Sequence, residues 1–197
     1  MPTALISVSN KIGLIEFGRV LHEFGWSLLA SGGTARTLKE SGIPVVEVSD
    51  YTNSPEILSG RVKTLHPAIH GGILARSTEE DASDLNKIRA RYIDLVICNL
   101  YPFQQTIAKP DTSLEDAIEN IDIGGVTLIR AAAKNFRRVI IITDPDDYPL
   151  ILEELRVNGE VSADRRRKLA KKAFFHTAAY DAAISSYFEQ LDKERDN

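Results

Sequence analysis

Short apolar runs alternate with stretches of helical periodicity along most of this chain, and the alternation limits the folds that it can adopt. The apolar runs, which read as strands, cover residues 3–8, 26–30, 44–48, 93–100 and 138–143. Between the first two runs, Leu14, Phe17 and Leu21 recur at the spacing of one helix face. Strands that alternate with helices form a largely parallel sheet. We therefore predict an α/β fold, a three-layer domain with a mainly parallel central sheet flanked by helices.

With 197 residues, 43% of them hydrophobic, the chain suits one domain with a substantial core. We assign residues 1–160 to the α/β core and residues 161–197 to a C-terminal helical extension of the same domain. In the extension, Leu169, Ala173 and Thr177 recur at helical spacing, which indicates one long helix or a pair. The charged residues 192–197 read as a disordered tail.

Composition excludes several classes of partner and site. The net charge of −4 gives no broad basic field for a nucleic-acid backbone, so any anion site must be local. Cys98 is the only cysteine, which rules out an internal disulfide and a cysteine-cluster metal site and fits a reducing cytoplasm. No run approaches the ~18 apolar residues of a membrane helix, and no signal-like segment opens the chain. We expect a cytoplasmic protein with no nucleic-acid or membrane partner.

Residues 60–76 combine cations, hydroxyls and glycines without helical or strand periodicity. Arg61 and Lys63 offer charged donors and Thr64 offers a hydroxyl. The pair of glycines at residues 71–72 lets the backbone approach a ligand closely. An anion-binding loop and an ordinary charged surface loop explain this stretch about equally well on local physics.

A second glycine-rich stretch, Ser31-Gly32-Gly33-Thr34, lies between an apolar strand and a polar helix. In this order, backbone N–H groups and hydroxyls at the helix start can surround a phosphate, and the helix dipole favours its charge. Two glycines alone are a weak signal, and a plain tight turn is the alternative. The stretch is not a Walker loop, because the Gly-Lys-Ser/Thr ending is absent.

Polar residues also follow two of the predicted strands. Ser9 follows the first strand, where it can cap the next helix or contact a ligand at that helix start. Asn99 and Tyr101 stand at the exit of the fourth strand, and ligands bind at the carboxyl ends of parallel strands. Simple packing of Tyr101, with its hydroxyl at the surface, is the alternative.

Asp122 precedes Gly124 and Gly125 at the start of a predicted helix, so its carboxylate lies beside free backbone donors. This combination suits proton transfer next to a developing oxyanion, and a buried cap is the plain alternative. Lys134 lies near the end of the same helix, about 18 Å away if the helix is straight at ~1.5 Å per residue. A shared role for Asp122 and Lys134 therefore requires a bend, which we predict, between Gly124 and Asn135.

His66 and His70 have the spacing of two zinc ligands on a helix. However, Pro67 lies between them and no His-Glu-x-x-His pattern is present. The sequence therefore predicts no metal site.

Four motifs, spread over essentially the whole chain, resemble the IMP cyclohydrolase domain, the N-terminal half of the bifunctional enzyme AICAR formyltransferase/IMP cyclohydrolase. They are residues 7–11 (Ser-Val-Ser-Asn-Lys), 30–34 (Ala-Ser-Gly-Gly-Thr), 60–67 (Gly-Arg-Val-Lys-Thr-Leu-His-Pro) and 121–135. The resemblance implies a methylglyoxal synthase-like fold. It also implies an activity in which the formylated aminoimidazole carboxamide ribonucleotide loses water and closes to inosine monophosphate (IMP).

The resemblance implies roles for individual residues as well. Its catalytic residues would be Lys63 for oxyanion stabilisation, Tyr101 for orientation, and Asp122 with Lys134 for proton transfer. The substrate's 5′-phosphate would be held by Ser9, Asn10, Lys11, Ser31, Gly32, Gly33 and Thr34, with Arg61 and Thr64 nearby. Its base would meet Asn99, Ile123 and Gly124. No metal or organic cofactor is needed.

The same fold family includes methylglyoxal synthase and the nucleotide-sensing domain of carbamoyl phosphate synthetase. A similar lyase, or a non-catalytic nucleotide- or phosphate-sensing module, is therefore the alternative. Lys63 and Lys134 favour the cyclohydrolase, because a pure sensor requires neither. The expected partner is a small purine nucleotide, and the sequence allows a homodimer. The bifunctional enzyme continues into a formyltransferase domain that this sequence does not contain, so we interpret the chain as an excised domain or a single-activity enzyme.

Overall fold

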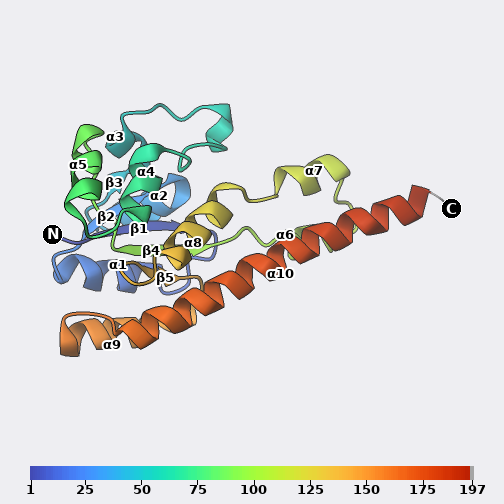
Figure 1. Ribbon diagram of the computed structural model, residues 1–197. Helices are drawn as coiled ribbons and strands as arrows, with labels where there is room; N and C mark the ends of the chain where they lie inside the picture. The colour runs from blue at the N-terminus through green and yellow to red at the C-terminus, as the bar shows by residue number, and fades with distance from the viewer. Residues whose placement is uncertain (196–197) are drawn as a thin grey trace.

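The computed structural model describes residues 1–195, and a five-stranded sheet in the order β3-β2-β1-β4-β5 forms its centre (Figure 1). The strands are β1 (Thr3–Val8), β2 (Ser27–Ala30), β3 (Val46–Glu47), β4 (Leu95–Asn99) and β5 (Ile140–Ile142). All four pairings between them are parallel. The predicted α/β fold with a parallel central sheet is therefore confirmed.

β1 is the central strand, and Leu5 and Ile6 within it are completely buried. The chain passes from β1 to β2 and β3 on one side and then returns to β4 on the other side, where Val8 pairs with Asn99. The strand order therefore reverses between β1 and β4. In open parallel sheets, ligands bind outside the carboxyl ends of the strands at such a reversal.

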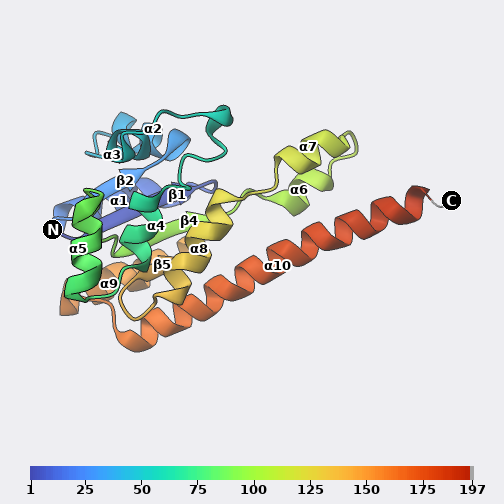
Figure 2. The same ribbon diagram turned by 45° about the horizontal axis from the view of Figure 1, so that its top comes forward.

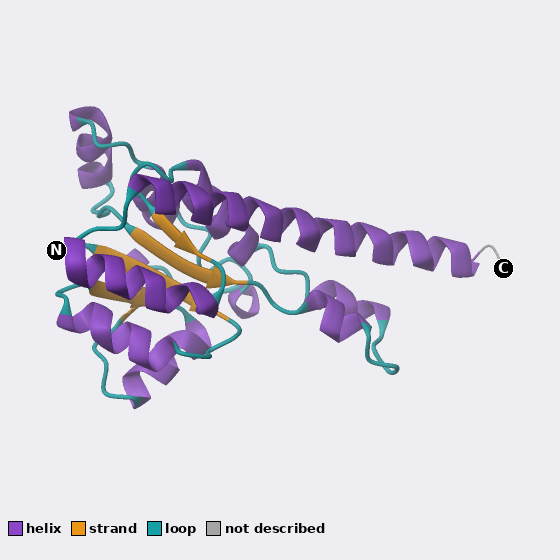
Figure 3. Cartoon of the chain, turned by 90° about the horizontal axis from the view of Figure 1, so that it is seen from below, coloured by secondary structure: helices purple, strands orange, loops and turns teal. Residues whose placement is uncertain are grey.

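Helices cover both faces of the sheet (Figures 1 and 3). On one face, α1 (Leu14–Glu23) packs against α9 (Tyr148–Asn158), and the rings of Phe17 and Tyr148 stack with centroids 4.3 Å apart. On the other face, α4 (Pro67–Leu74) packs against α8 (Gly124–Lys134). The shorter elements are α2 (Gly32–Glu40), α3 (Val48–Thr52), η1 (Leu58–Gly60), α5 (Glu79–Lys87), α6 (Phe103–Ile107), α7 (Leu114–Glu119) and η2 (Pro145–Asp147).

The last element, α10 (Ala163–Arg195), is one helix of 33 residues, about 50 Å long at ~1.5 Å per residue. It packs against α8 and β5 and then projects past the sheet beside α6 and α7 (Figures 1 and 2). Phe103 of α6 makes edge contacts with Tyr180 and Tyr187 of α10, with ring centroids 6.2 and 5.7 Å apart. The helical extension is therefore a single helix, and the α6 segment packs against the part of it that projects past the sheet.

One glycine-rich stretch that reads as a loop in the sequence forms α4 instead. His66 is its N-cap, and the His66 Nδ1 accepts a hydrogen bond from the Ala68 N–H at 3.1 Å. Pro67 occupies the first turn, where a helix needs no donor from its first residue. Gly72 lets α4 approach the backbone carbonyl of Arg91, which a side chain would prevent. This glycine therefore serves helix packing, and not the close approach of a ligand.

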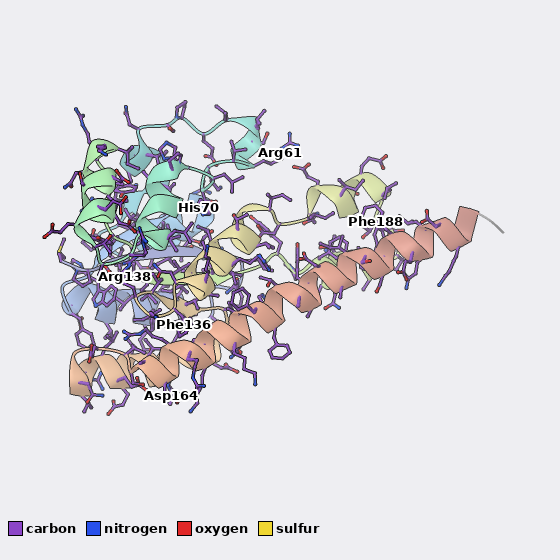
Figure 4. The ribbon with its side chains drawn as sticks, in the orientation of Figure 1. Arg61, His70, Phe136, Arg138, Asp164 and Phe188 are labelled. Atoms are coloured by element: carbon purple, nitrogen blue, oxygen red, sulfur yellow. The ribbon has the colours of Figure 1, made fainter. Side chains whose placement is uncertain are left out.

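The C-terminal end of α4 is fixed by two side chains that follow α8. The Arg138 guanidinium and the Asn135 amide donate hydrogen bonds to carbonyls of Gly72, Ile73 and Ala75. The two shortest join Arg138 Nη2 to the Gly72 oxygen at 2.6 Å and Asn135 Nδ2 to the Ile73 oxygen at 2.7 Å. These bonds satisfy carbonyls that a helix end leaves free. They hold α4, which carries His70, firmly beside α8 (Figure 4).

Two expectations about element ends are wrong. Residues 192–195, predicted to be disordered, continue α10, while residues 196 and 197 lie outside the described residues. Ser9 does not cap the first helix, because α1 begins at Leu14 with Gly13 as its N-cap in a left-handed conformation (φ 69°). Ser9 lies instead in the loop that leaves β1.

Candidate active site

Asn99 ties the loop after β1 to the end of β4 at the reversal of strand order. Its Oδ1 accepts hydrogen bonds from the Ser9 N–H at 2.7 Å and the Asn10 N–H at 2.9 Å. Its Nδ2 donates to the Asn10 carbonyl at 3.1 Å. The amide is thus engaged with backbone and fixes the loop that carries Lys11. Its contact with the base of a nucleotide stays a prediction.

The start of α2 has the geometry of an anion site. Ser31 is an extended N-cap, and no side chain caps this helix within the described residues. A β-carbon built on Gly32 would lie 2.9 Å from the Lys63 Nζ, and one on Gly33 would lie 3.7 Å from the Lys11 Nζ. Two ammonium groups from different loops therefore stand over backbone donors at the positive end of the helix dipole. This arrangement suits a phosphate group.

The two hydroxyls beside this helix start already have partners. The Thr34 Oγ1 accepts a hydrogen bond from the Val8 N–H at 3.1 Å and donates to the Val8 carbonyl at 3.2 Å. The Ser31 Oγ lies 3.3 Å from the Ser7 Oγ. A hydroxyl has one proton to donate, so in this conformation the Thr34 side chain holds β1 against α2, and its contact with a phosphate stays a prediction.

The loop before α4 directs its two cations to different places. The Lys63 Nζ pairs with the Glu56 Oε1 at 3.1 Å, close to the start of α2. Arg61 points away toward α7, where its Nη1 lies 3.7 Å from the Glu119 Oε2 and both side chains are mostly exposed (Figure 4). Solvent screens an exposed pair of this kind, so it restrains Arg61 weakly. In this conformation, Lys63 is the cation of the motif that reaches α2.

Thr64 connects the same loop to the start of α8. It is buried, and its Oγ1 would lie 2.7 Å from a β-carbon on Gly124, so this contact requires a glycine. Behind it, burial lowers the pKa of His70, and the backbone carbonyl of Thr64 opposes that shift. The His70 Nε2 is buried and has no hydrogen-bond partner among residues 1–195. The adjacent residues Lys63 and Thr64 thus link the starts of α2 and α8.

Asp122 supplies a carboxylate to the start of α8. Its Oδ1 accepts a hydrogen bond from the Gly125 N–H at 2.7 Å. The Asp122 N–H donates to the Tyr180 hydroxyl of α10 at 2.8 Å. Burial raises the pKa of the Asp122 carboxyl, while the N–H groups of Gly125 and Tyr101 oppose that shift. A half-buried carboxylate with a raised pKa is suited to exchange protons closer to neutral pH.

Tyr101 and Ile123 are neighbours of Asp122 with exposed side chains. Tyr101 is 56% exposed and Ile123 is 57% exposed. Large side chains in a core are buried, so these two have no structural role in the interior of the domain. They are free to contact a ligand beside Asp122, and their roles in orientation and base binding stay predictions.

Lys134 lies at the opposite end of α8 from Asp122. The helix runs without a break from Gly124 to Lys134, so the predicted bend is wrong. Ten steps of ~1.5 Å place the two ends of this helix about 15 Å apart along the axis. Lys134 is exposed in the last turn, where the helix dipole favours a cation. This chain alone does not bring Lys134 and Asp122 together.

A cavity of about 200 Å³ opens beside the start of α2. Its lining includes Ser31, Gly32, Glu56, Lys63 and His66, and it includes neither Tyr101 nor Asp122. The cavity therefore belongs to the phosphate end of the site.

Two residues that help to build the site were not singled out from the sequence. Glu56 precedes Lys63 by seven residues, and a carboxylate so close to a cationic motif was a visible signal. Tyr180 is 58 residues away from Asp122, and no local pattern indicates that contact. Among residues 1–195, no group of three His, Cys, Asp or Glu side chains is arranged to hold a metal ion. The same residues form no helix long and apolar enough to cross a membrane.

The parallel sheet with a reversal of strand order defines a doubly wound α/β domain, and its uncapped helix start beside two lysines suits a phosphate group. The family described as "MGS-like domain" matches residues 13–127, and the family described as "AICARFT/IMPCHase bienzyme" matches residues 132–197. The chain belongs to the MGS-like domain family, and its remaining part matches the AICARFT/IMPCHase bienzymes.

The chain is 55% identical over 193 residues to the bifunctional purine biosynthesis protein PurH of a Bacillus cereus strain. It is 54% identical to PurH of Bacillus thuringiensis (strain Al Hakam). Each match covers 97% of this chain but 38% of the relative, so the chain spans about two fifths of the length of these curated relatives. The solved structure described as "Crystal structure of ForH" matches with a TM-score of 0.84 and 38% identity, covering 95% of this chain and 98% of that chain.

Proposed function

We propose that this chain is an IMP cyclohydrolase, which closes 5-formamidoimidazole-4-carboxamide ribonucleotide to IMP with loss of water in purine biosynthesis. The observation that carries the proposal is the pair of helix starts joined by Lys63 and Thr64, one suited to a phosphate and the other equipped with Asp122. The match to the AICARFT/IMPCHase bienzymes and to PurH supports this activity over a methylglyoxal synthase-like lyase or a sensing module.

The substrate's phosphate would occupy the start of α2. The N–H groups of Gly32 and Gly33 and the ammonium groups of Lys11 and Lys63 supply donors and charge there. The ribose and base would then extend from the α2 start toward the α8 start. This path brings the base toward Ile123 and Gly124, as the sequence motif implies.

Ring closure joins the carboxamide nitrogen of the substrate to its formyl carbon. One proton leaves that nitrogen, the formyl oxygen gains a proton, and the resulting hydroxyl departs as water with the proton of the former formamide nitrogen. The Asp122 carboxylate is the group we assign to accept and return a proton, because burial raises its pKa. The motif implies that Lys63 stabilises negative charge on the reacting oxygen, a role that competes with the place of its Nζ at the phosphate end, and Tyr101 would orient the base.

Lys134 has no part in this sequence of steps within one chain, because it lies at the far end of α8. Its catalytic role rests on the motif alone. Activity that falls strongly in Lys134→Ala, with an unchanged fold, would require a route to the site that a single chain does not provide.

The proposal extends to partners and compartment. The relatives are named bifunctional, so we propose that a formyltransferase domain provides the formylated substrate. We also propose a homodimer located in the cytoplasm, where a buried free thiol such as that of Cys98 is maintained. Light scattering on the purified chain tests the dimer, and a monomer at micromolar concentration would contradict it.

The decisive test is ring closure on purified protein, followed through the ultraviolet absorbance of the purine that forms. We expect saturable turnover of the formylated ribonucleotide, far above the rate without protein. Tight binding of IMP with no turnover would contradict the enzyme assignment and would favour a sensing module.

A further inference from the structure

Glu56 holds the ammonium group that stands at the phosphate end of the site. The Glu56 Oε1 lies 3.1 Å from the Lys63 Nζ, and the Lys63 side chain is 32% exposed. The same Nζ would lie 2.9 Å from a β-carbon on Gly32, at the first residue of α2. Lys63 is therefore shared between the uncapped helix start and a carboxylate of its own loop.

The backbone between the two residues is shaped around this ion pair. A β-carbon on Gly60 would collide with the Glu56 Oε1 and would lie 3.3 Å from the Lys63 Nζ. Gly60 also has a φ of 84°, which side chains disfavour. Position 60 thus leaves the space in which carboxylate and ammonium meet.

The loop that carries Glu56 adopts a costly conformation. Asn53, Leu58 and Ser59 have φ values of 50°, 51° and 55°, in the left-handed region that Leu and Ser rarely adopt. Burial compensates little, because Ile57 and Leu58 are 54% and 60% exposed. A strained and exposed loop of this kind loses little stability when its ion pair with Lys63 is exchanged for another contact.

We propose that Glu56 is a positioning residue that occupies the anion's place on Lys63 in the free protein and yields it to the phosphate of the ligand. A carboxylate and a phosphate repel each other, so a phosphate bound at the start of α2 disfavours the Glu56 carboxylate beside the same ammonium. Before ligand arrives, Glu56 keeps Lys63 directed at α2. Binding then replaces the internal pair, and its free energy is reduced by the loss of that pair. The inference rests on the proposed function, because it assumes a phosphate-bearing nucleotide.

Calorimetry with IMP on the full chain tests the proposal through Glu56→Gln. The variant keeps the size of the side chain and removes its charge, so IMP should bind about three- to fivefold tighter, the effect expected of one partly exposed ion pair. KM for the ring-closure substrate should fall by the same factor. The matched control is Asp50→Asn, which removes one exposed carboxylate from the neighbouring α3 and should leave IMP affinity unchanged. Unchanged or weaker binding to Glu56→Gln would overturn the proposal.

A double-mutant cycle identifies Lys63 as the group through which Glu56 acts. In a Lys63→Gln background, Glu56→Gln should give no further gain, and an equal gain there would also overturn the proposal. If Glu56→Gln fails to fold by circular dichroism, Glu56→Asp withdraws the carboxylate by one methylene and should again tighten binding. Failure of IMP to bind the wild-type protein at all would count against the proposed function, whereas normal IMP binding without an effect of Glu56 would refute this inference alone.

Discussion

Two helices of this domain begin with a pair of glycines at the carboxyl edge of the sheet, and they begin differently. α2 starts with Gly32 and Gly33, has no side-chain cap in the described chain, and has two lysine ammonium groups nearby. α8 starts with Gly124 and Gly125, and the Gly125 N–H is occupied by the carboxylate of Asp122. The start of α2 is open to an external anion, whereas the start of α8 is occupied by the carboxylate of Asp122.

The difference teaches that the polar side chain within two residues before a glycine pair decides what the helix start can do. Ser31 leaves the donors of α2 free, because its hydroxyl pairs with Ser7. Asp122 fills the donor of α8 and repels a second anion there. A substrate with a phosphate at one end and a reacting amide at the other can therefore lie in one orientation only. The proposed function therefore assigns phosphate binding to the α2 start and the reaction to the α8 start.

The largest expected effect concerns the α8 start. Asp122→Asn should lower kcat by about 10²- to 10⁴-fold, because the group that moves the proton is lost. IMP affinity should change little, since the phosphate is held at α2. Steady-state kinetics and calorimetry on one preparation measure both quantities, with the exposed Asp111→Asn as a control. A loss confined to IMP affinity would break the division between the two starts.

The next largest effect concerns Lys63, which lies in the loop that links the starts of α2 and α8. Lys63→Ala should lower kcat by about 10²- to 10³-fold, as expected for losing one donor to an oxyanion. The fold should survive, because the side chain lies at the surface of the loop. Normal kcat with a raised KM would move Lys63 entirely to the phosphate end, near Gly32 where its Nζ lies.

Alanine at the two glycine pairs sharpens the comparison in terms of stability. A β-carbon on Gly125 would lie 2.6 Å from the Asp122 Oδ2 and 2.8 Å from the Leu100 Cδ2. Gly125→Ala should therefore lower the free energy of unfolding by about 1–3 kcal/mol. A β-carbon on Gly33 would meet only the end of the Lys11 side chain, at 3.7 Å. Gly33→Ala should therefore change the free energy of unfolding by less than about 1 kcal/mol. Urea unfolding measures both, and equal losses would contradict the packing described here.

The smallest effect is a pH dependence at the α8 start. Burial raises the pKa of Asp122, so the folded protein binds its proton more tightly than the unfolded chain does. Its contribution to stability should be lost as pH rises from about 4, the unfolded value, through the raised folded value. Asp122→Asn lacks this loss and keeps an oxygen for the Gly125 N–H. The variant should gain stability relative to wild type as pH rises to 7, and a relative loss would contradict the assignment.

Sequence periodicity was sufficient to predict the fold and the position at which α2 begins. Buried strands are recognisable as apolar runs, and the order of strand, Ser31-Gly32-Gly33-Thr34 and helix predicts where α2 begins. The two glycines alone were a weak signal for a phosphate, which the family motifs strengthened. The Thr34 hydroxyl could not be assigned, because its partner Val8 lies 26 residues away on another strand. α4 was missed because Gly71 and Gly72 disfavour an isolated helix, and tertiary packing overrides that preference.

The chemistry at the second start was only partly visible. The sequence places Asp122 beside Gly124 and Gly125, which the structure bears out in the bond to the Gly125 N–H. It also suggested a bend that would return Lys134 to the site, and α8 has none. A motif shows that Asp122 and Lys134 occur together in the sequence, but it does not show how far apart the helix places their side chains. The hydroxyl of Tyr180, which meets the Asp122 backbone from α10, depends on the position of a whole helix.

The division of labour between the two helix starts is tested most directly by comparing IMP with inosine in calorimetry on the wild-type chain. The two ligands differ by the phosphate alone, which we assign to α2 and its two lysines. Charge-assisted hydrogen bonds of about 1.5–3 kcal/mol each predict that IMP binds at least ~100-fold more tightly than inosine. Equal affinities would mean that the open start of α2 does not hold the phosphate.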